Sequence, residues 1–237
     1  PDTGNVAISL NIEKRDEIRQ QWIDKMLVSS GLLADPKTRA KYIDLDAAFW
    51  PLYDKCRPFT MTSIERMYDL YKSVEYIVKA GIPGAIVECG VWQGGAMMLA
   101  AYTLQECGDH SRTLMLYDTF QGLPPPDKSI DIDSLGFTAD SQWAPGWAEA
   151  RIGVVQENMR STGYPLDWVQ FIEGMVEETL PRIRDEKWQA AIVRLDTDWY
   201  ASSKVELDVL WSRIAVGGLL ILDDYGQWLG ARKAADE

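Results

Sequence analysis

The feature that most constrains the fold is an apolar run that ends in two acids. Residues 190–195 are apolar except for Arg194, and Asp196 and Asp198 follow this run closely. Such a run is typical of a strand that is buried on both faces of a parallel sheet. In open α/β sheets, ligands bind beyond the carboxyl ends of the strands. The run therefore predicts a parallel sheet with acidic side chains at its ligand-binding edge.

A second apolar run, residues 217–222, ends in Asp223 and Asp224. Two buried strands would thus bring four carboxylates to the same edge of the sheet. Like charges that lie close together raise one another's pKa unless a cation joins them. We interpret the four acids as a site for a hard divalent cation such as Mg²⁺. The simpler alternative is that solvated acids end two unrelated strands.

Strands and helices alternate along the chain from residue 85 onward. Strands are predicted at 85–91, 113–120, 169–176, 190–195 and 217–222. Helices are predicted at 94–107, 147–162, 201–213 and from 228. This alternation predicts an α/β fold with a doubly wound, mainly parallel sheet.

Two further segments show local signals outside this alternation. Residues 62–65 read Thr-Ser-Ile-Glu, a capping-box pattern in which Thr62 is the N-cap and Glu65 reaches back to it. Residues 121–146 form one long connection that contains three consecutive prolines. Connections of this length in compact domains are usually functional lids or disordered segments.

A glycine-containing turn, residues 88–95, leads from the first predicted strand into a helix. Its spacing is not the G-x-G-x-x-G of dinucleotide-binding proteins, which argues against an NAD oxidoreductase. Glu88, which precedes the first glycine, suits a cofactor with a positive amino group. Asp118 ends the second predicted strand, where an acid usually accepts a hydrogen bond from ribose. Together these features are typical of S-adenosylmethionine-dependent methyltransferases.

The charge and the cysteines exclude several classes of partner and compartment. A formal net charge of −12 argues against nucleic acid and against an anionic membrane surface as partners. The three cysteines are odd in number and lack metal-type spacing, which predicts reduced thiols in a cytoplasm. No run approaches the roughly 18 apolar residues of a membrane span, and no leader pattern is present. We therefore expect a cytoplasmic protein.

Several segments together resemble the macrocin O-methyltransferase (TylF-type) family, which methylates sugar hydroxyls on macrolide and aminocoumarin natural products in antibiotic biosynthesis. They are MTSIERM at 61–67, VECGVW at 87–92, YDTFQG at 117–122, STGYP at 161–165, RLDTDWY at 194–200, DDYG at 223–226 and GARKA at 230–234. The resemblance covers most of the chain from about residue 60 to residue 235.

The resemblance implies a class I, Rossmann-like methyltransferase that depends on Mg²⁺ and uses S-adenosylmethionine. It implies that Mg²⁺ is held by Asp196, Asp223 and Asp224, and that Asp196 and Asp198 are the catalytic acids, with Asp198 as the base near the acceptor. The residues expected to bind the cofactor are Met61, Thr62, Glu88, Gly90, Val91, Trp92, Gly95, Ala96, Asp118, Phe120, Gly174 and Asp196.

The acceptor is expected to be a glycoside with two neighbouring hydroxyls, because octahedral Mg²⁺ takes six oxygen ligands and three aspartates leave positions for both. Among the aromatic residues near the acids, Trp199 is predicted to line the site. Two alternatives remain: an O-methyltransferase for a catechol or another small phenol, and a methyltransferase-like binding module without turnover.

Two parts of the chain are expected. Residues 1–60 would form an N-terminal helical and lid segment, although its aromatic part, residues 30–60, could instead pack as an ordinary cap. Residues 61–237 would form the S-adenosylmethionine-binding domain. Family members usually continue into two further strands, so C-terminal strands are expected to be missing here. The aromatic N-terminal segment also favours a homo-oligomer.

Overall fold

The computed structural model describes residues 41–141, 143–183 and 187–237. The helical part predicted within residues 1–40 lies outside these described residues.

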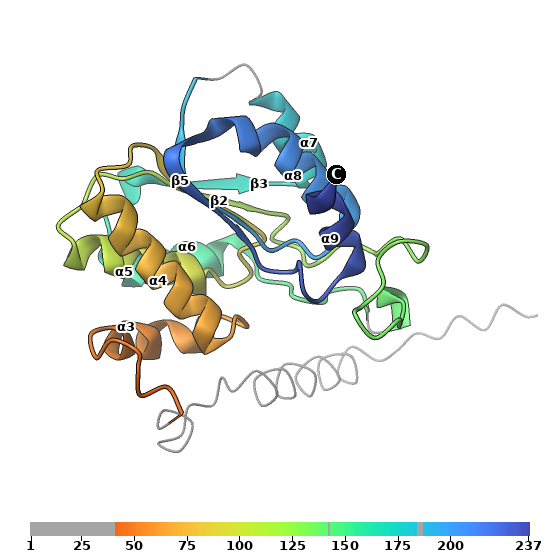
Figure 1. The fold of residues 1–237 in the computed structure, drawn as a ribbon, viewed down its shortest axis with the longest axis horizontal. Helices are drawn as coiled ribbons and strands as arrows, with labels where there is room; N and C mark the ends of the chain where they lie inside the picture. The colour runs from red at the N-terminus through yellow and green to blue at the C-terminus, as the bar shows by residue number, and fades with distance from the viewer. Residues whose placement is uncertain (1–40, 142, 184–186) are drawn as a thin grey trace, which may run out of the picture.

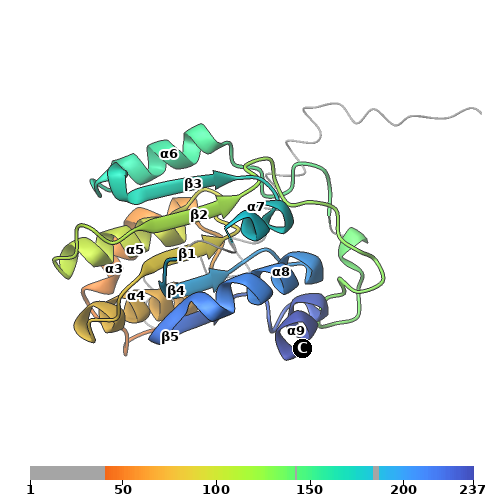
Figure 2. The same ribbon diagram turned by 90° about the horizontal axis from the view of Figure 1, so that it is seen from above.

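The predicted parallel sheet is present and has five strands in the described residues. They are β1 (Ala85–Cys89), β2 (Leu114–Asp118), β3 (Val169–Glu173), β4 (Ala190–Leu195) and β5 (Ile214–Leu222). All neighbouring strands pair in parallel, in the order β3-β2-β1-β4-β5, as Figure 2 shows. Because β1 and β4 are buried along their whole length, each reads in the sequence as an apolar run with a single charged residue, Glu88 in β1 and Arg194 in β4.

Helices cover both faces of the sheet (Figure 1). One face carries α3 (Phe49–Cys56), α4 (Ile64–Lys79), α5 (Gly95–Glu106) and α6 (Ile152–Ser161). The other carries α7 (Val176–Arg182), α8 (Tyr200–Leu210) and α9 (Leu229–Asp236). Short 3₁₀ turns lie at Arg57–Phe59, Ala139–Ser141, Leu166–Trp168 and Trp211–Arg213. Each face has its own apolar core, so the prediction of a doubly wound α/β fold is confirmed.

The predicted N-cap of α4 is wrong by one residue. Ser63, not Thr62, caps the helix, because its Oγ accepts a hydrogen bond from the backbone N–H of Arg66 at 3.5 Å. The Thr62 hydroxyl instead accepts a hydrogen bond from Nη2 of Arg194 at 3.0 Å. A buried guanidinium needs acceptors on every side, and this tertiary contact outweighs the local capping pattern.

The described part of the aromatic N-terminal segment packs as a cap on the core. Phe49 and Tyr53 of α3 are fully buried. The Phe49 ring lies 5.1 Å from the ring of Tyr68 and 5.5 Å from that of Tyr71, both on α4. Edge-to-face and tilted ring pairs at these distances stabilise helix packing. For residues 49–56 the structure therefore favours the cap over the lid.

The long connection 121–146 is folded wherever the structure describes it. Asp131 is buried, and its Oδ1 accepts a hydrogen bond from the backbone N–H of Tyr200 at the start of α8 (2.9 Å). The indole N–H of Trp199 donates to the carbonyl oxygen of Pro124 at 2.8 Å. These contacts attach the connection to the carboxyl edge of the sheet.

The sheet ends at β5 within the described part of the chain, and Val216 on this strand is 96% exposed. None of the helices in the described ranges combines the length and the hydropathy that a bilayer crossing requires.

Candidate active site

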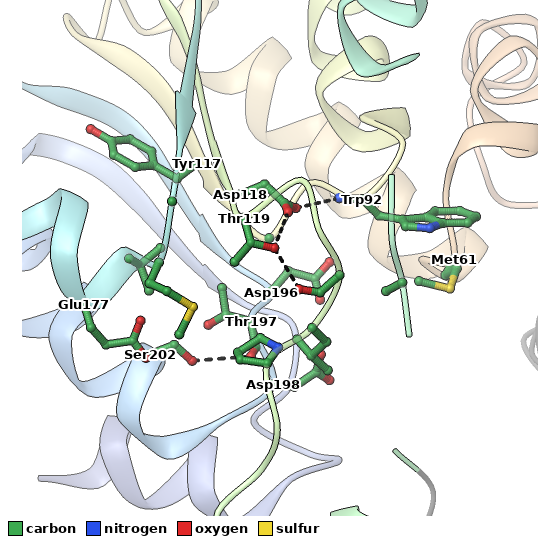
Figure 3. A pocket seen from close by; sticks show the side chains of 18 residues that line it. Met61, Trp92, Tyr117, Asp118, Thr119, Glu177, Asp196, Thr197, Asp198 and Ser202 are labelled. Atoms are coloured by element: carbon green, nitrogen blue, oxygen red, sulfur yellow. Dashed lines mark hydrogen bonds between the residues drawn. The ribbon is translucent and has the colours of Figure 1, made fainter. Parts of the chain in front are cut away.

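Two adjoining cavities lie at the carboxyl ends of the strands. The first, with a volume of about 660 Å³, lies beyond β2 and β3 and is shown in Figure 3. The second, of about 700 Å³, lies beyond β4 and β5. They share Met61, Gly90, Trp92, Leu123, Ala148, Asp196 and Asp198 as lining residues. In open α/β folds, ligands bind at this edge of the sheet.

The turn after β1 approaches the backbone of another segment so closely that it requires glycine. Gly90 has φ +82°, and a Cβ at this position would lie 1.9 Å from the carbonyl oxygen of Asp196. This left-handed turn also explains why β1 ends at Cys89, two residues before its predicted end.

The carboxylate of Asp118 binds the backbone of the same glycine turn. Its Oδ2 accepts hydrogen bonds from the backbone N–H groups of Val91 (2.8 Å) and Trp92 (3.0 Å). Its Oδ1 accepts from the N–H of Phe120 at 2.8 Å. Burial raises the pKa of Asp118, and these three hydrogen bonds oppose the shift. The carboxylate lines the first cavity, so it can bind a ligand and position the glycine turn at once.

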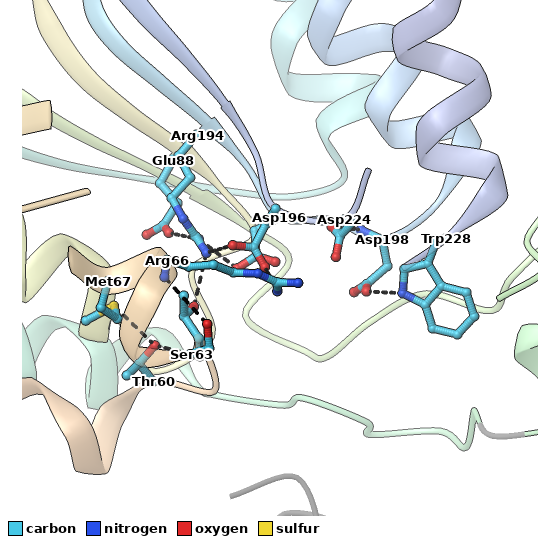
Figure 4. A network of polar contacts seen from close by, with 12 residues as sticks. Thr60, Ser63, Arg66, Met67, Glu88, Arg194, Asp196, Asp198, Asp224 and Trp228 are labelled. Atoms are coloured by element: carbon cyan, nitrogen blue, oxygen red, sulfur yellow. Dashed lines mark hydrogen bonds and ion pairs between the residues drawn. The ribbon is translucent and has the colours of Figure 1, made fainter. Parts of the chain in front are cut away.

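A buried arginine connects the acids at the edge of the sheet (Figure 4). Arg194 on β4 lies directly beside Glu88 on β1 in the strand register, and its side chain is 2% exposed. Nη1 donates to Glu88 and, at 2.7 Å, to Oδ2 of Asp196. Nη2 donates to Asp223 on the loop after β5.

In the sequence, Arg194 is visible only as an interruption of an apolar run. A charged side chain in a strand buried on both faces requires paired carboxylates, and this was the signal that could have identified it.

The two acids after β5 have different surroundings. Asp223 contacts Arg194 and also accepts a hydrogen bond from Nη1 of Arg66 at 2.6 Å. Asp224 accepts a hydrogen bond from the backbone N–H of Asp198 at 3.0 Å. Burial raises the pKa of Asp224 well above its usual value, and the neighbouring carboxylates of Asp198, Asp196 and Asp223 raise it further.

Asp198 is held in an unusual backbone conformation with φ +66°. Its Oδ1 accepts a hydrogen bond from the indole N–H of Trp228 at 2.6 Å. Burial raises the pKa of Asp198 to about 6, while the hydrogen bond from Trp228 opposes this shift. Asp198 lines both cavities, so it lies where the two ligand spaces meet.

The acids meet the requirements of a divalent cation site. One carboxylate oxygen each from Asp196, Asp223 and Asp224 lies within 4.8 Å of the others. Five carboxylates and two guanidinium groups make up this cluster, so negative charge is in excess: Glu88, Asp196, Asp198, Asp223, Asp224, Arg66 and Arg194. Oxygen ligands with excess negative charge are what Mg²⁺ binds in proteins.

The structure brings most of the predicted cofactor-binding residues to these cavities. Those that line one or both are Met61, Thr62, Glu88, Gly90, Val91, Trp92, Ala96, Asp118, Gly174 and Asp196.

Three predicted positions do not line either cavity. Gly95 packs against the 3₁₀ turn Arg57–Phe59, since a Cβ at Gly95 would lie 2.5 Å from the carbonyl oxygen of Phe59. Phe120 is buried in the core and contributes its N–H to Asp118. Trp199 packs edge-on against Trp228, with ring centroids 5.1 Å apart, and Trp228 rather than Trp199 lines the second cavity.

Several residues that line the first cavity are not among the predicted site residues. Thr197 and Ser202 follow β4, and Glu177 lies in the first turn of α7. They reach the first cavity because parallel strands direct all of their following segments to one edge of the sheet.

The open parallel sheet in this strand order, with helices on both faces and cavities at its carboxyl edge, is the fold of class I methyltransferases such as NovP. A solved structure described as the O-methyltransferase NovP has this fold, with a TM-score of 0.64, 28% sequence identity, and coverage of 76% of this chain and 72% of that one.

The chain belongs to the macrocin-O-methyltransferase (TylF) family, whose model matches residues 13–237. It is thus an S-adenosylmethionine-dependent O-methyltransferase. It is 28% identical over 232 residues to demethyldecarbamoylnovobiocin O-methyltransferase of Streptomyces niveus, covering 91% of this chain and 84% of the relative. It is 32% identical over 168 residues to 8-demethyl-8-(2,3-dimethoxy-alpha-L-rhamnosyl)-tetracenomycin-C 4'-O-methyltransferase of Streptomyces olivaceus. That match covers 70% of this chain and 62%, less than two thirds, of the relative.

Proposed function

We propose that this enzyme methylates a hydroxyl of a sugar on a natural product and requires a divalent cation, Mg²⁺, held by Asp196, Asp223 and Asp224. The observation that carries the proposal is the excess of carboxylates beside the cavity that Asp118 lines. The sugar acceptor is supported by the tetracenomycin relative, which is named for methylation of a rhamnosyl compound.

The two cavities fit the two halves of S-adenosylmethionine. The first has Asp118 and a largely apolar wall, which suits the nucleoside. The second contains Glu88, whose Oε2 is buried without a hydrogen-bond partner among the described residues. Burial raises the pKa of Glu88 to about 7, which a cationic partner would reverse. Glu88 would therefore hold the ammonium group of the cofactor.

Replacing Asp118 should weaken binding of the cofactor product, S-adenosylhomocysteine. Asp118→Ala is expected to cost about 1.5–3 kcal/mol in calorimetry, because a charge-assisted hydrogen bond to ribose is lost. Asp118→Asn keeps one oxygen for the Val91 and Trp92 amides, so it separates ribose binding from support of the turn. The control is Asp167→Asn, which changes an exposed acid. Unchanged affinity in both Asp118 variants would remove this residue from the site.

Asp198 would accept the proton of the reacting hydroxyl. When bound, a divalent cation would lower the pKa of a hydroxyl that it contacts. Asp198 borders both cavities, so its carboxylate can reach an acceptor placed next to the cofactor. The hydrogen bond from Trp228 fixes one carboxylate oxygen of Asp198 and so orients the base. Most of the rate would come from alignment of the acceptor oxygen with the methyl group.

Acceptor assays test the substrate class directly. We expect turnover with a glycoside that has two neighbouring hydroxyls and little or none with a catechol. Each assay is run with Mg²⁺ and with excess EDTA. Preference for the catechol would favour the small-phenol alternative, with the same cofactor and cation.

We further propose a cytoplasmic enzyme that acts on a small-molecule acceptor rather than on nucleic acid or at a membrane, since the chain carries a net charge of −12. Residues 61–237 would supply the cofactor and cation sites, and residues 1–60 would contribute to acceptor choice and to a homo-oligomer.

A further inference from the structure

A buried acid on α8 contacts the turn that carries Asp198. Glu206 is fully buried, shares the buried side of α8 with Ser202, Val209 and Leu210, and lines neither cavity. An apolar residue would suit this position, because a carboxyl group in the core costs free energy unless it binds a specific partner. The partner of Glu206 therefore indicates what this acid does.

The partner is the hydroxyl of Thr197, which donates a hydrogen bond to Oε1 of Glu206 at 3.0 Å. Thr197 lies between Asp196, a proposed cation ligand, and Asp198, the proposed base (Figure 3). The bond thus attaches the loop after β4 to the middle of α8. Since its acceptor is fully buried, water cannot readily replace it.

The backbone of this loop is strained at Asp198. The N–H of Trp199 donates to the carbonyl oxygen of Thr197 at 2.7 Å, so the three residues form a γ-turn with Asp198 at its centre. Asp198 has φ +66°, the positive value of the rare and strained form of this turn. Strained backbone of this kind persists only where the surrounding structure fixes it.

The contacts that fix the two acids of the loop differ. Arg194 donates to the carboxylate of Asp196 at 2.7 Å, so this side chain has its own support. The backbone N–H of Asp198 donates to Asp224, which is itself a proposed cation ligand. Glu206 holds the turn from outside the proposed cation and acceptor site.

We propose that Glu206 is a positioning residue for Asp198, which holds the strained turn through the Thr197 hydroxyl and so keeps the base aligned with the acceptor. The inference rests on the proposed role of Asp198 as the base. A displacement of about 1 Å can lower a rate by about 10²-fold. Because Glu206 lines neither cavity, its loss should appear in kcat rather than in the affinity for ligands.

A double-mutant cycle tests the proposal, with steady-state kinetics at saturating substrates and calorimetry for S-adenosylhomocysteine and Mg²⁺. Glu206→Met and Thr197→Val remove the bond while keeping side chains of similar size. Each should lower kcat by about 10- to 100-fold. Both dissociation constants should stay within about threefold of wild type. The double variant should lose no more than either single variant, because all three lack the same hydrogen bond.

Glu206→Gln should rescue the activity that Glu206→Met loses. Burial raises the pKa of Glu206 to about 8, so the acid is largely neutral at pH 7 and an amide resembles it. The amide oxygen can still accept the hydrogen bond from Thr197. We expect a kcat within about threefold of wild type for this variant.

Thr103→Val is the matched control for the loss of a buried hydroxyl. Thr103 on α5 is fully buried, lines neither cavity, and donates to the carbonyl oxygen of Leu99 at 2.8 Å. This variant should lower the melting temperature and keep the wild-type kcat. If Glu206→Met does not fold, Thr197→Val decides the question, because its side chain is only partly buried.

Three results would each overturn the inference: wild-type kcat in Thr197→Val and Glu206→Met, losses that multiply in the double variant, or an equal loss in Thr103→Val. Asp198→Asn separates these from a failure of the proposed base. If Asp198→Asn loses kcat and the two bond-removing variants do not, only the present inference is wrong. If Asp198→Asn keeps the wild-type kcat, the proposed base is wrong, and the positioning role of Glu206 is wrong with it.

Discussion

Asp198→Asn is expected to lower kcat by about 10²- to 10⁴-fold, the usual contribution of a general base. The asparagine keeps an oxygen for the indole N–H of Trp228. It also tolerates the left-handed backbone at this position, where φ is +66°. The variant should therefore fold normally. We expect it to bind S-adenosylhomocysteine within about threefold of wild type, because it loses a proton acceptor rather than a ligand contact.

The measurements are steady-state kinetics with a saturating acceptor, and calorimetry for S-adenosylhomocysteine and Mg²⁺. Asp208→Asn serves as the control, because Asp208 is an exposed acid on α8 whose side chain is 52% exposed. A kcat for Asp198→Asn within about tenfold of wild type would show that another group takes the proton.

Removing any one of the three proposed cation ligands should have the largest effect. Asp196→Asn, Asp223→Asn and Asp224→Asn are each expected to lower activity by at least about 10³-fold, since a bound cation stabilises developing charge by several kcal/mol. Excess EDTA should abolish wild-type turnover, and added Mg²⁺ should restore it. Turnover of the wild type in excess EDTA would contradict the cation mechanism and leave Asp198 as a base acting alone.

Stability in EDTA should distinguish the two acids that follow β5. Asp223→Asn is expected to lower the free energy of unfolding by about 1–3 kcal/mol, because Arg66 and Arg194 lose a charged partner. Asp224→Asn is expected to raise it by about 1 kcal/mol, because it removes an acid whose ionised form is disfavoured by burial and by the neighbouring carboxylates. Urea unfolding without metal measures both.

If both substitutions lowered the free energy of unfolding equally, the inference that Asp223 is paired with arginines while Asp224 is surrounded by acids would be wrong. Added Mg²⁺ should raise the stability of the wild type and leave that of Asp224→Asn nearly unchanged, since the variant lacks one ligand.

The sequence alone was enough to predict the sheet and the edge at which the site lies. The runs at 190–195 and 217–222 correspond to β4 and to the second half of β5. A strand buried on both faces is a local pattern, and parallel strands must end at the same edge. For that reason Asp196, Asp223 and Asp224 could be placed together without knowing any distance, and the structure brings their oxygens within 4.8 Å.

Local patterns failed where a distant residue decides the outcome. Thr62 looked like an N-cap, but the guanidinium of Arg194 takes its hydroxyl. Gly95 stays a prediction as a cofactor residue, and in the fold it allows the carbonyl of Phe59 to approach α5. Trp199 looked like a wall of the site, but it packs behind Trp228. None of these partners is near in sequence.

What the sequence by itself determined was the order of elements and the kinds of side chain delivered to the carboxyl edge. Only the tertiary structure decided which charges are paired. Arg194 pairs with Glu88, Asp196 and Asp223, while Asp224 has acids as its neighbours and one oxygen of Glu177 has no donor among the described residues. Hydrophobic periodicity depends on residues a few positions apart. Pairing and desolvation instead depend on distances between atoms from different strands, which the packing of the whole sheet sets.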